Sequence, residues 1–237
     1  WAGGFDVVLG NPPWERIKLQ EEEFFANKAP DIANARNKSE RDKLIASLQT
    51  GEPFDKELYA EFIRGKHAAE ATSNFVHMRP ADYALCRYPL TGVGDTNLYA
   101  LFAELFLSLR NGNGSECRAG FIVPSGIATD DSTKMYFAQI ALHGQLASLY
   151  DFENREGLFP AVDSRMKFSL VTIGEHKTGD FAFFLTNTTQ LEDKRRHFTL
   201  SSEEFALINP NTVTCPVFRS TEDAELTKKI YHRVPVL

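Results

Sequence analysis

Cysteine is scarce in this chain of 237 residues: only Cys86, Cys117 and Cys215 occur, far apart and odd in number. A disulfide framework needs an even set at closer spacing, and zinc usually requires Cys or His pairs about two to four residues apart. Neither pattern is present. The sequence therefore predicts no disulfide scaffold and no metal site, and it favours buried, inert thiols in a reducing, cytoplasmic compartment.

Long apolar runs, repeats and low-complexity tracts are also missing. No stretch approaches the roughly 18 uninterrupted apolar residues of a membrane span, and the first residues hold no signal peptide. A hydrophobic share of 43% leaves enough apolar material for a core. The net charge of −6 argues against a stand-alone domain that holds DNA by charge alone. It does not argue against a catalytic module whose DNA-gripping surface lies elsewhere.

Both ends of the sequence are abrupt. The chain starts at Trp1 rather than Met and runs almost at once into a buried-strand pattern, and a helix at 224–231 has barely begun when the sequence stops. We expect a piece from the middle of a longer protein.

Short apolar runs alternate with helical patterns, which predicts an α/β sheet. Strands are expected at 5–9, 119–123 and 146–152, and helices at 98–109 and 134–142. Asp95 or Thr96 is the expected cap of the first helix, whose buried stripe would be Leu98, Leu101, Phe102, Leu105, Phe106 and Leu109. Runs at 168–173 and 181–185 are separated by a connection too short for a crossover, so we expect them to pair as an antiparallel hairpin in a mixed sheet.

Three parts are expected along the chain. Residues 1–14 and 91–187 would form a catalytic subdomain, and 15–90 a helical insertion with helices at 16–27, 31–48 and 55–75. Residues 188–237 would form a C-terminal segment that leads to a truncated downstream region. This segment includes a helix opened by the capping box Ser201-x-x-Glu204.

The sequence Asn11-Pro12-Pro13-Trp14 directly follows the first strand, where open α/β sheets place their ligands. Two prolines fix the backbone and remove two N–H donors, so carbonyls here are free to accept. Asn11 adds an amide carbonyl, and Trp14 offers a flat stacking face. Two acceptors can hold an exocyclic NH2 group and make its nitrogen pyramidal, with the lone pair aimed at an electrophilic methyl group. A rigid turn with a packed Trp is the alternative.

At these residues the sequence resembles the amino-group methyltransferases with an Asn/Asp-Pro-Pro-aromatic signature. Phe5 to Glu15 is most similar to the large adenine-N6 DNA methyltransferases of bacterial restriction–modification and related phage-defence systems. Weaker similarity continues through Asp95 to Tyr99, Gly120 to Pro124 and Leu158 to Phe168, and so covers most of the span to about residue 175.

The resemblance implies S-adenosylmethionine as cofactor and double-stranded DNA with a flipped adenine as partner. Asn11 and the Pro12 carbonyl would hold the amine, Pro13 would complete the rigid loop, and Trp14 would stack on the base. The family's glycine-rich cofactor loop lies upstream of this motif, and nothing here replaces it, so the cofactor-binding residues are expected before Trp1 and a target-recognition domain after Leu237.

The fold that the resemblance implies is a Rossmann-like sheet with strand order 3-2-1-4-5-7-6. The strands expected here would form its 4-5-7-6 side and leave the strand at Phe5 as an exposed apolar edge. We expect a piece that folds but has no methyltransferase activity and no tight cofactor binding of its own.

Other candidate sites are weaker. Gly92-Val93-Gly94 and 111–114 are expected to be helix-flanking loops, and His67 and His77 surface residues rather than a metal pair. Ser125 lacks the Gly-x-Ser-x-Gly elbow of a nucleophile. The run 194–197 is expected to be a solvated loop rather than a phosphate contact. Two other functions stay open: a methyltransferase acting on RNA bases or on a glutamine amide, and a non-catalytic binding or scaffold domain.

Overall fold

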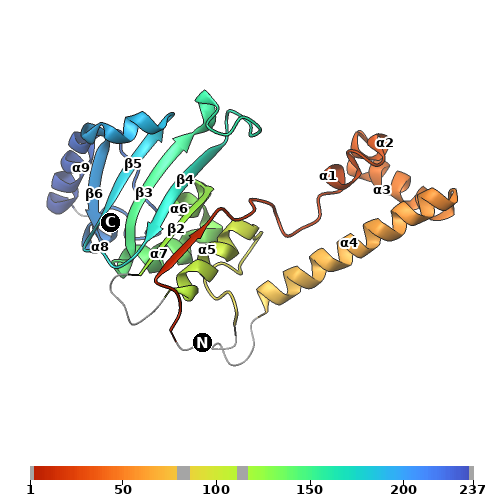
Figure 1. Cartoon of the computed structure of the whole chain (residues 1–237), viewed down its shortest axis with the longest axis horizontal. Helices are drawn as coiled ribbons and strands as arrows, with labels where there is room; N and C mark the ends of the chain where they lie inside the picture. The colour runs from red at the N-terminus through yellow and green to blue at the C-terminus, as the bar shows by residue number, and fades with distance from the viewer. Residues whose placement is uncertain (1–2, 79–85, 111–116, 235–237) are drawn as a thin grey trace. The chain divides into compact units, whose positions relative to one another are not determined.

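The computed structural model describes residues 3–78, 86–110 and 117–234. Six strands form one mixed sheet in the order β1-β2-β4-β3-β5-β6, with β1 and β6 at opposite edges (Figure 1). The strands are β1 (Val7–Gly10), β2 (Arg118–Pro124), β3 (Leu146–Glu153), β4 (Lys167–Ile173), β5 (Thr178–Leu185) and β6 (His197–Ser201). Together with its helices, this sheet confirms the predicted α/β class.

The strand directions follow from the pairings. Strands β1 and β2 are parallel, β4 is antiparallel to both β2 and β3, and β3 is parallel to β5. The order β1-β2-β4-β3 is the 4-5-7-6 side of the Rossmann-like sheet that the resemblance implies, because the fourth strand in the chain lies between the second and the third. Strands β5 and β6 extend the sheet beyond that side.

The predicted hairpin of 168–173 with 181–185 is wrong, because β3 lies between β4 and β5. The connecting residues 174–177 pass over the amino end of β3. There the Gly174 N–H donates to the Gln145 carbonyl and the His176 N–H to the Gly144 carbonyl, each at 2.8 Å. Four extended residues reach ~13 Å, which exceeds two strand spacings of together ~10 Å. A short connection thus rules out a crossover helix but allows passage over one strand end. The antiparallel pair at this end of the sheet is β5 with β6.

Helices α5 (Leu98–Leu109), α6 (Gly126–Thr129), α7 (Lys134–Leu142) and α8 (Ser202–Ile208) pack on one face of this sheet and share its main core (Figure 1). The predicted bounds of α5 and α7 are confirmed. The capping box of α8 is also confirmed: the Ser201 hydroxyl accepts from the Glu204 N–H, and the Glu204 carboxylate accepts from the Ser201 N–H. The last helix, α9 (Thr221–Arg233), is longer than the predicted 224–231.

Helix α5 faces the sheet differently from the prediction. Only Leu101 of the expected stripe is fully buried, and the buried face consists mainly of Tyr99, Ala100, Ala103 and Glu104. The helix is apolar nearly all round, so apolar spacing cannot fix its orientation, and two alanines allow a closer approach to the sheet. The expected cap is also wrong: the N-cap residue is Asn97, and the Thr96 hydroxyl donates to the Thr91 and Val93 carbonyls instead.

The edge strand β1 exposes apolar side chains, as predicted. Val7 and Leu9 are 71% and 84% exposed, whereas Val8 and Gly10 are half-buried on the face that carries α5. On the exposed face, the neighbouring side chains of Ile122 and Leu170 are only half-buried as well.

The chain divides into two compact units, one of residues 1–15 and 88–237 and one of residues Arg16–Arg87. The second unit contains α1 (Glu21–Phe25), α2 (Pro30–Ala33), α3 (Lys38–Ser47), the 3-10 turn η1 (Leu48–Thr50) and α4 (Pro53–His77). Its core gathers around Phe25, Ile32, Ile45, Leu58 and Phe62.

Two predicted helices of this unit are shorter or divided. Residues 16–20 are not helical, and the expected helix at 31–48 is split because Asn37 starts a new helix, its side chain accepting from the Glu40 N–H. No helix in the described ranges is long and apolar enough to cross a membrane.

Candidate active site at the carboxyl edge of the sheet

Asn11-Pro12-Pro13-Trp14 leaves the sheet at the carboxyl end of β1, beside the matching end of β2, since Gly10 pairs with Phe121. Asn11 and Pro13 are exposed and Pro12 is buried. Because the two prolines carry no N–H, the parallel ladder cannot continue through them. Asn11 lines a cavity of about 530 Å³ whose other walls are mostly apolar and include Leu9, Ile122 and Leu170.

Trp14 is half-buried and held in place on several sides. Its indole N–H donates to the Ile122 carbonyl at 3.3 Å. Its ring stacks on Phe168, with centroids 6.3 Å apart and planes at 28°, and meets the edge of Phe159 at 6.4 Å. Trp14 is not among the residues that line the cavity beside Asn11. Because Asn11 would hold the amine of the same base on which Trp14 stacks, we expect the two side chains to face one open cleft. This shared cleft stays a prediction.

The motif is also tied to α5. The carbonyl of Glu15, the next residue, accepts from the Leu98 N–H at 2.9 Å. The second stretch of the resemblance, Asp95 to Tyr99, therefore meets the first in space. The loop before α5, which contains Gly92-Val93-Gly94, is fixed by Glu104, whose buried carboxylate accepts from the N–H groups of Leu90 and Thr91.

A buried carboxylate lies next to this edge. Asp151, 6% exposed, accepts hydrogen bonds from the hydroxyls of Ser125 and, at 2.8 Å, Ser169. Burial raises the pKa of Asp151 above its usual value, and the two hydroxyls oppose that shift. Burial also raises the pKa of the Cys215 thiol, with the charge of Asp151 as the second cause. Ser125 thus serves as a hydrogen-bond donor to the buried Asp151 carboxylate.

The loop between β3 and β4 is organised by Asn154. This side chain is 0% exposed, and its Nδ2 donates to the carbonyls of Phe159, Val162 and Asp163 while its Oδ1 accepts from the Phe159 N–H. Phe159, which touches Trp14, is therefore fixed through its own backbone. Sequence reasoning missed both Asp151 and Asn154. No signal in the sequence distinguishes them, because β3 also contains Ser148, Tyr150 and Glu153.

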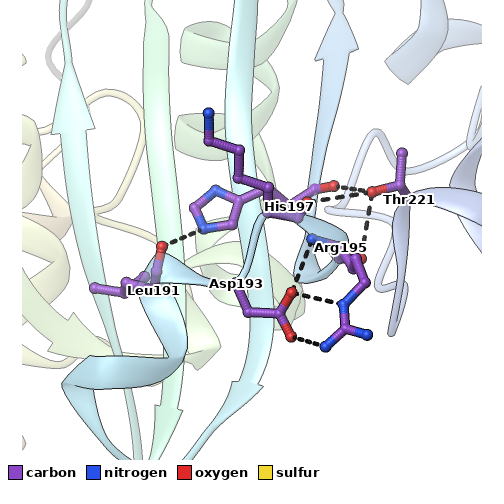
Figure 2. Close-up of polar contacts among 6 residues, drawn as sticks. Leu191, Asp193, Arg195, His197 and Thr221 are labelled. Atoms are coloured by element: carbon purple, nitrogen blue, oxygen red, sulfur yellow. Dashed lines mark hydrogen bonds and ion pairs between the residues drawn. The ribbon is translucent and has the colours of Figure 1, made fainter.

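Within the basic run at 194–197, the Arg195 and His197 side chains are bound to neighbouring residues, as Figure 2 shows. The Arg195 guanidinium makes two hydrogen bonds of 2.9 Å to the Asp193 carboxylate, which lowers the pKa of Asp193 to about 2. The Thr221 hydroxyl donates to the His197 carbonyl at 2.6 Å, and the His197 Nε2 lies 3.0 Å from the Leu191 carbonyl (Figure 2). These contacts favour the interpretation as a solvated loop over a phosphate contact.

The remaining candidate residues do not form a metal site in the part of the chain that the structure describes. Among the residues that the structure describes, no three His, Cys, Asp or Glu side chains come together to hold a metal ion. The expected helix-ending loop at 111–114 lies outside the described residues.

Comparison with known proteins gives distant likenesses of fold only. No family model matches the chain, and no curated protein matches it. Among solved structures, the chain is similar to a structure of a type I restriction–modification system, with TM-score 0.42, 10% identity and 63% of this chain covered. It is similar to a type I methyltransferase subunit from Streptococcus thermophilus, with TM-score 0.42, 8% identity and 58% covered. A third is the ATP-dependent type ISP restriction–modification enzyme LlaBIII bound to DNA, with TM-score 0.30, 13% identity and 75% covered.

The chain spans only 39%, 34% and 10% of those three structures' own chains. At these TM-scores the likenesses carry no argument about what the chain does.

Proposed function

We propose that this chain is the target-base side of an adenine-specific DNA methyltransferase, which transfers a methyl group from S-adenosylmethionine to the N6 amine of a flipped adenine in a restriction–modification or phage-defence system. The observation that carries the proposal is the position of Asn11-Pro12-Pro13-Trp14, directly after β1, in a sheet ordered β1-β2-β4-β3.

The chemistry of the loop suits an amine substrate. The Asn11 side-chain carbonyl and the Pro12 backbone carbonyl would accept the two N–H protons of the amine. The nitrogen lone pair, no longer delocalised into the ring, would then point at the methyl group. Because this work is done mainly in the transition state, its loss would lower kcat more than it would raise KM.

Trp14 would stack on the extruded base. Its tie to Ile122 and its packing on Phe168 support this role, since a platform fixed before the base arrives costs less entropy on binding.

The hydrogen-bonding groups of this loop fit the amine and not the cofactor. The exposed Asn11 and the N–H-free prolines offer acceptors, while the described residues contain no glycine-rich turn between a strand and a helix that could cradle S-adenosylmethionine. The cofactor, when bound, supplies the electrophilic methyl group, and we propose that the residues holding it precede Trp1. Calorimetric titration of this chain with S-adenosylmethionine should then give no saturable micromolar binding.

Methylation by the natural full-length protein tests the proposal. Duplex DNA is incubated with S-adenosylmethionine labelled in its methyl group, and digested nucleosides are analysed by mass spectrometry for N6-methyladenine. Asn11→Ala should abolish the product while leaving the unfolding midpoint nearly unchanged, because Asn11 is exposed on a loop. The matched control is Asn211→Ala, at another exposed asparagine in a loop.

Label in RNA or in a glutamine side chain, but not in DNA, would instead support the related methyltransferases that use the same motif. DNA binding with no methyl transfer to any of these substrates would support a scaffold domain. Near-wild-type rates for Asn11→Ala would remove the catalytic role of this loop.

A further inference from the structure

We infer that Asn154 is a positioning residue for Trp14: it fixes the β3–β4 loop so that Phe159 holds the indole ring in one orientation. The inference rests on the proposed function only for its catalytic meaning. The contact chain itself runs through residues that the structure describes.

The first step is the loop. Asn154 directly follows β3 with its side chain wholly inside the protein, and all of its amide contacts go to one loop, residues 159–163. Its backbone N–H also donates to the Met166 carbonyl at 2.9 Å, and its carbonyl accepts from the Gly157 N–H at 3.0 Å. Both ends of the loop thus meet at one residue. A buried amide satisfied in this way is costly to remove, because its partners are left without hydrogen bonds.

The second step is the aromatic contact. Phe159 receives two of these hydrogen bonds on its own backbone, at its N–H (2.9 Å) and at its carbonyl (3.0 Å). Its ring packs edge-on against Phe168 at 5.0 Å and against Trp14 at 6.4 Å. A shift of the loop would therefore move one of the two rings that bound the indole.

The third step concerns Phe168, the residue of β4 on which Trp14 stacks. Phe168 stacks on Phe152 at 5.4 Å with planes only 8° apart, so it is fixed by the sheet and does not depend on the loop. Trp14 thus has two supports that belong to the sheet, Phe168 and the Ile122 carbonyl, and one that depends on Asn154, Phe159. Loss of Asn154 should loosen the orientation of Trp14 without releasing it from Phe168.

The test observes Trp14 directly, without DNA. The protein is labelled with 5-fluorotryptophan, and the ¹⁹F resonance of Trp14 is assigned by its disappearance in Trp14→Phe. Asn154→Ala should shift or broaden this resonance. Asn209→Ala is the matched control, because its Nδ2 donates to the Thr214 carbonyl and hydroxyl within a different loop, and it should leave the resonance in place.

Phe159→Leu keeps the backbone bonds to Asn154 and removes only the ring. It should perturb Trp14 as Asn154→Ala does, and the double variant should add little. An unmoved Trp14 resonance in either folded variant would overturn the inference. If Asn154→Ala does not fold, Asn154→Asp takes its place, because it keeps the acceptor for the Phe159 N–H and loses the Nδ2 donors to the loop carbonyls.

Methylation kinetics then separate this inference from the proposed function. Asn154→Ala should raise the KM for DNA roughly ten-fold, as expected for a weakened stacking contact, with a smaller effect on kcat. A shifted resonance, together with a natural full-length protein that methylates nothing, would uphold the positioning and overturn the methyltransferase proposal. An unshifted resonance in an active enzyme would do the reverse.

Discussion

The indole N–H of Trp14 donates to the backbone carbonyl of Ile122 at 3.3 Å, so the last residue of the loop after β1 is fastened to the neighbouring strand β2. One ring thereby links the candidate catalytic loop to the sheet. The bond also uses the polar atom of the indole, which leaves the ring faces and edges for packing.

Substitution of Trp14 should separate the bond from the packing. Trp14→Phe keeps a ring against Phe168 and leaves the Ile122 carbonyl without its donor, at a cost of about 1 kcal/mol in the free energy of unfolding. Trp14→Ala also loses the ring contacts and should cost more, toward the low end of the roughly 3–5 kcal/mol seen for buried aromatic truncations, because Trp14 is half-buried. Urea unfolding monitored by circular dichroism measures both. Equal losses in the two variants would mean that the packing contributes nothing.

Gly10, the last residue of β1, should not tolerate a side chain. A Cβ placed there would lie 2.5 Å from the Phe106 ring, so either this ring or α5 would have to move. Gly10→Ala should destabilise the protein by roughly 1–3 kcal/mol, the usual cost of overpacking. Gly3→Ala is the control, because a Cβ at Gly3 would meet no described atom within 4 Å. A fully stable Gly10→Ala protein would show that the Phe106 ring or α5 gives way at little cost in free energy.

Two acids on β3 should make opposite contributions to stability in acid. The hydrogen bond from Lys167, followed by the charges of Lys167 and Arg155, lowers the pKa of Glu153 from 4.5. Its stabilisation is therefore present above about pH 4.5 and is lost as pH falls through the lower folded pKa. Burial raises the pKa of Asp151, so as pH falls the folded state binds a proton at this carboxylate before the unfolded state does. Protonation of Asp151 therefore raises the free energy of unfolding as pH falls.

Unfolding free energies measured between pH 7 and pH 3 check the two signs. Glu153→Gln should lose less stability on acidification than the wild type, and Asp151→Asn should lose more. The same slope in both variants would contradict the assignment of the two environments.

Sequence reasoning predicted β1 to β5 and the helix at 134–142 because apolar period and turn residues are local signals, but it missed β6 (His197–Ser201). It failed where tertiary contacts decide. The connection at 174–177 is as compatible with passage over β3 as with a hairpin, and only the place of β3 in the sheet chooses between them. Helix α5 is apolar all round, so its buried face depends on which side chains fit against β2.

The candidate site shows the same division. Asn11 and Trp14 could be picked out because their residue types in that order are unusual. Asp151 and Asn154 could not, since an aspartate or asparagine near a strand end is ordinary in sequence. The roles of Asp151 and Asn154 depend on their burial and on hydrogen-bond partners from other segments of the chain.

The edge strand β1 should make this chain self-associate. Among the described residues β1 pairs with β2 alone, and it presents Val7 and Leu9, 71% and 84% exposed, beside the half-buried Ile122. An apolar edge with unpaired backbone groups is a template for another strand, and a lysine placed on it opposes such pairing. Leu9→Lys should therefore reduce the self-association of the 237-residue chain, measured by sedimentation velocity over a range of concentrations. Leu226→Lys replaces an apolar residue of α9 that is 60% exposed and should leave the association unchanged, because a helix surface offers no unpaired backbone. If the wild-type chain sediments as a monomer throughout, or if both lysine variants reduce association equally, β1 is not the surface responsible.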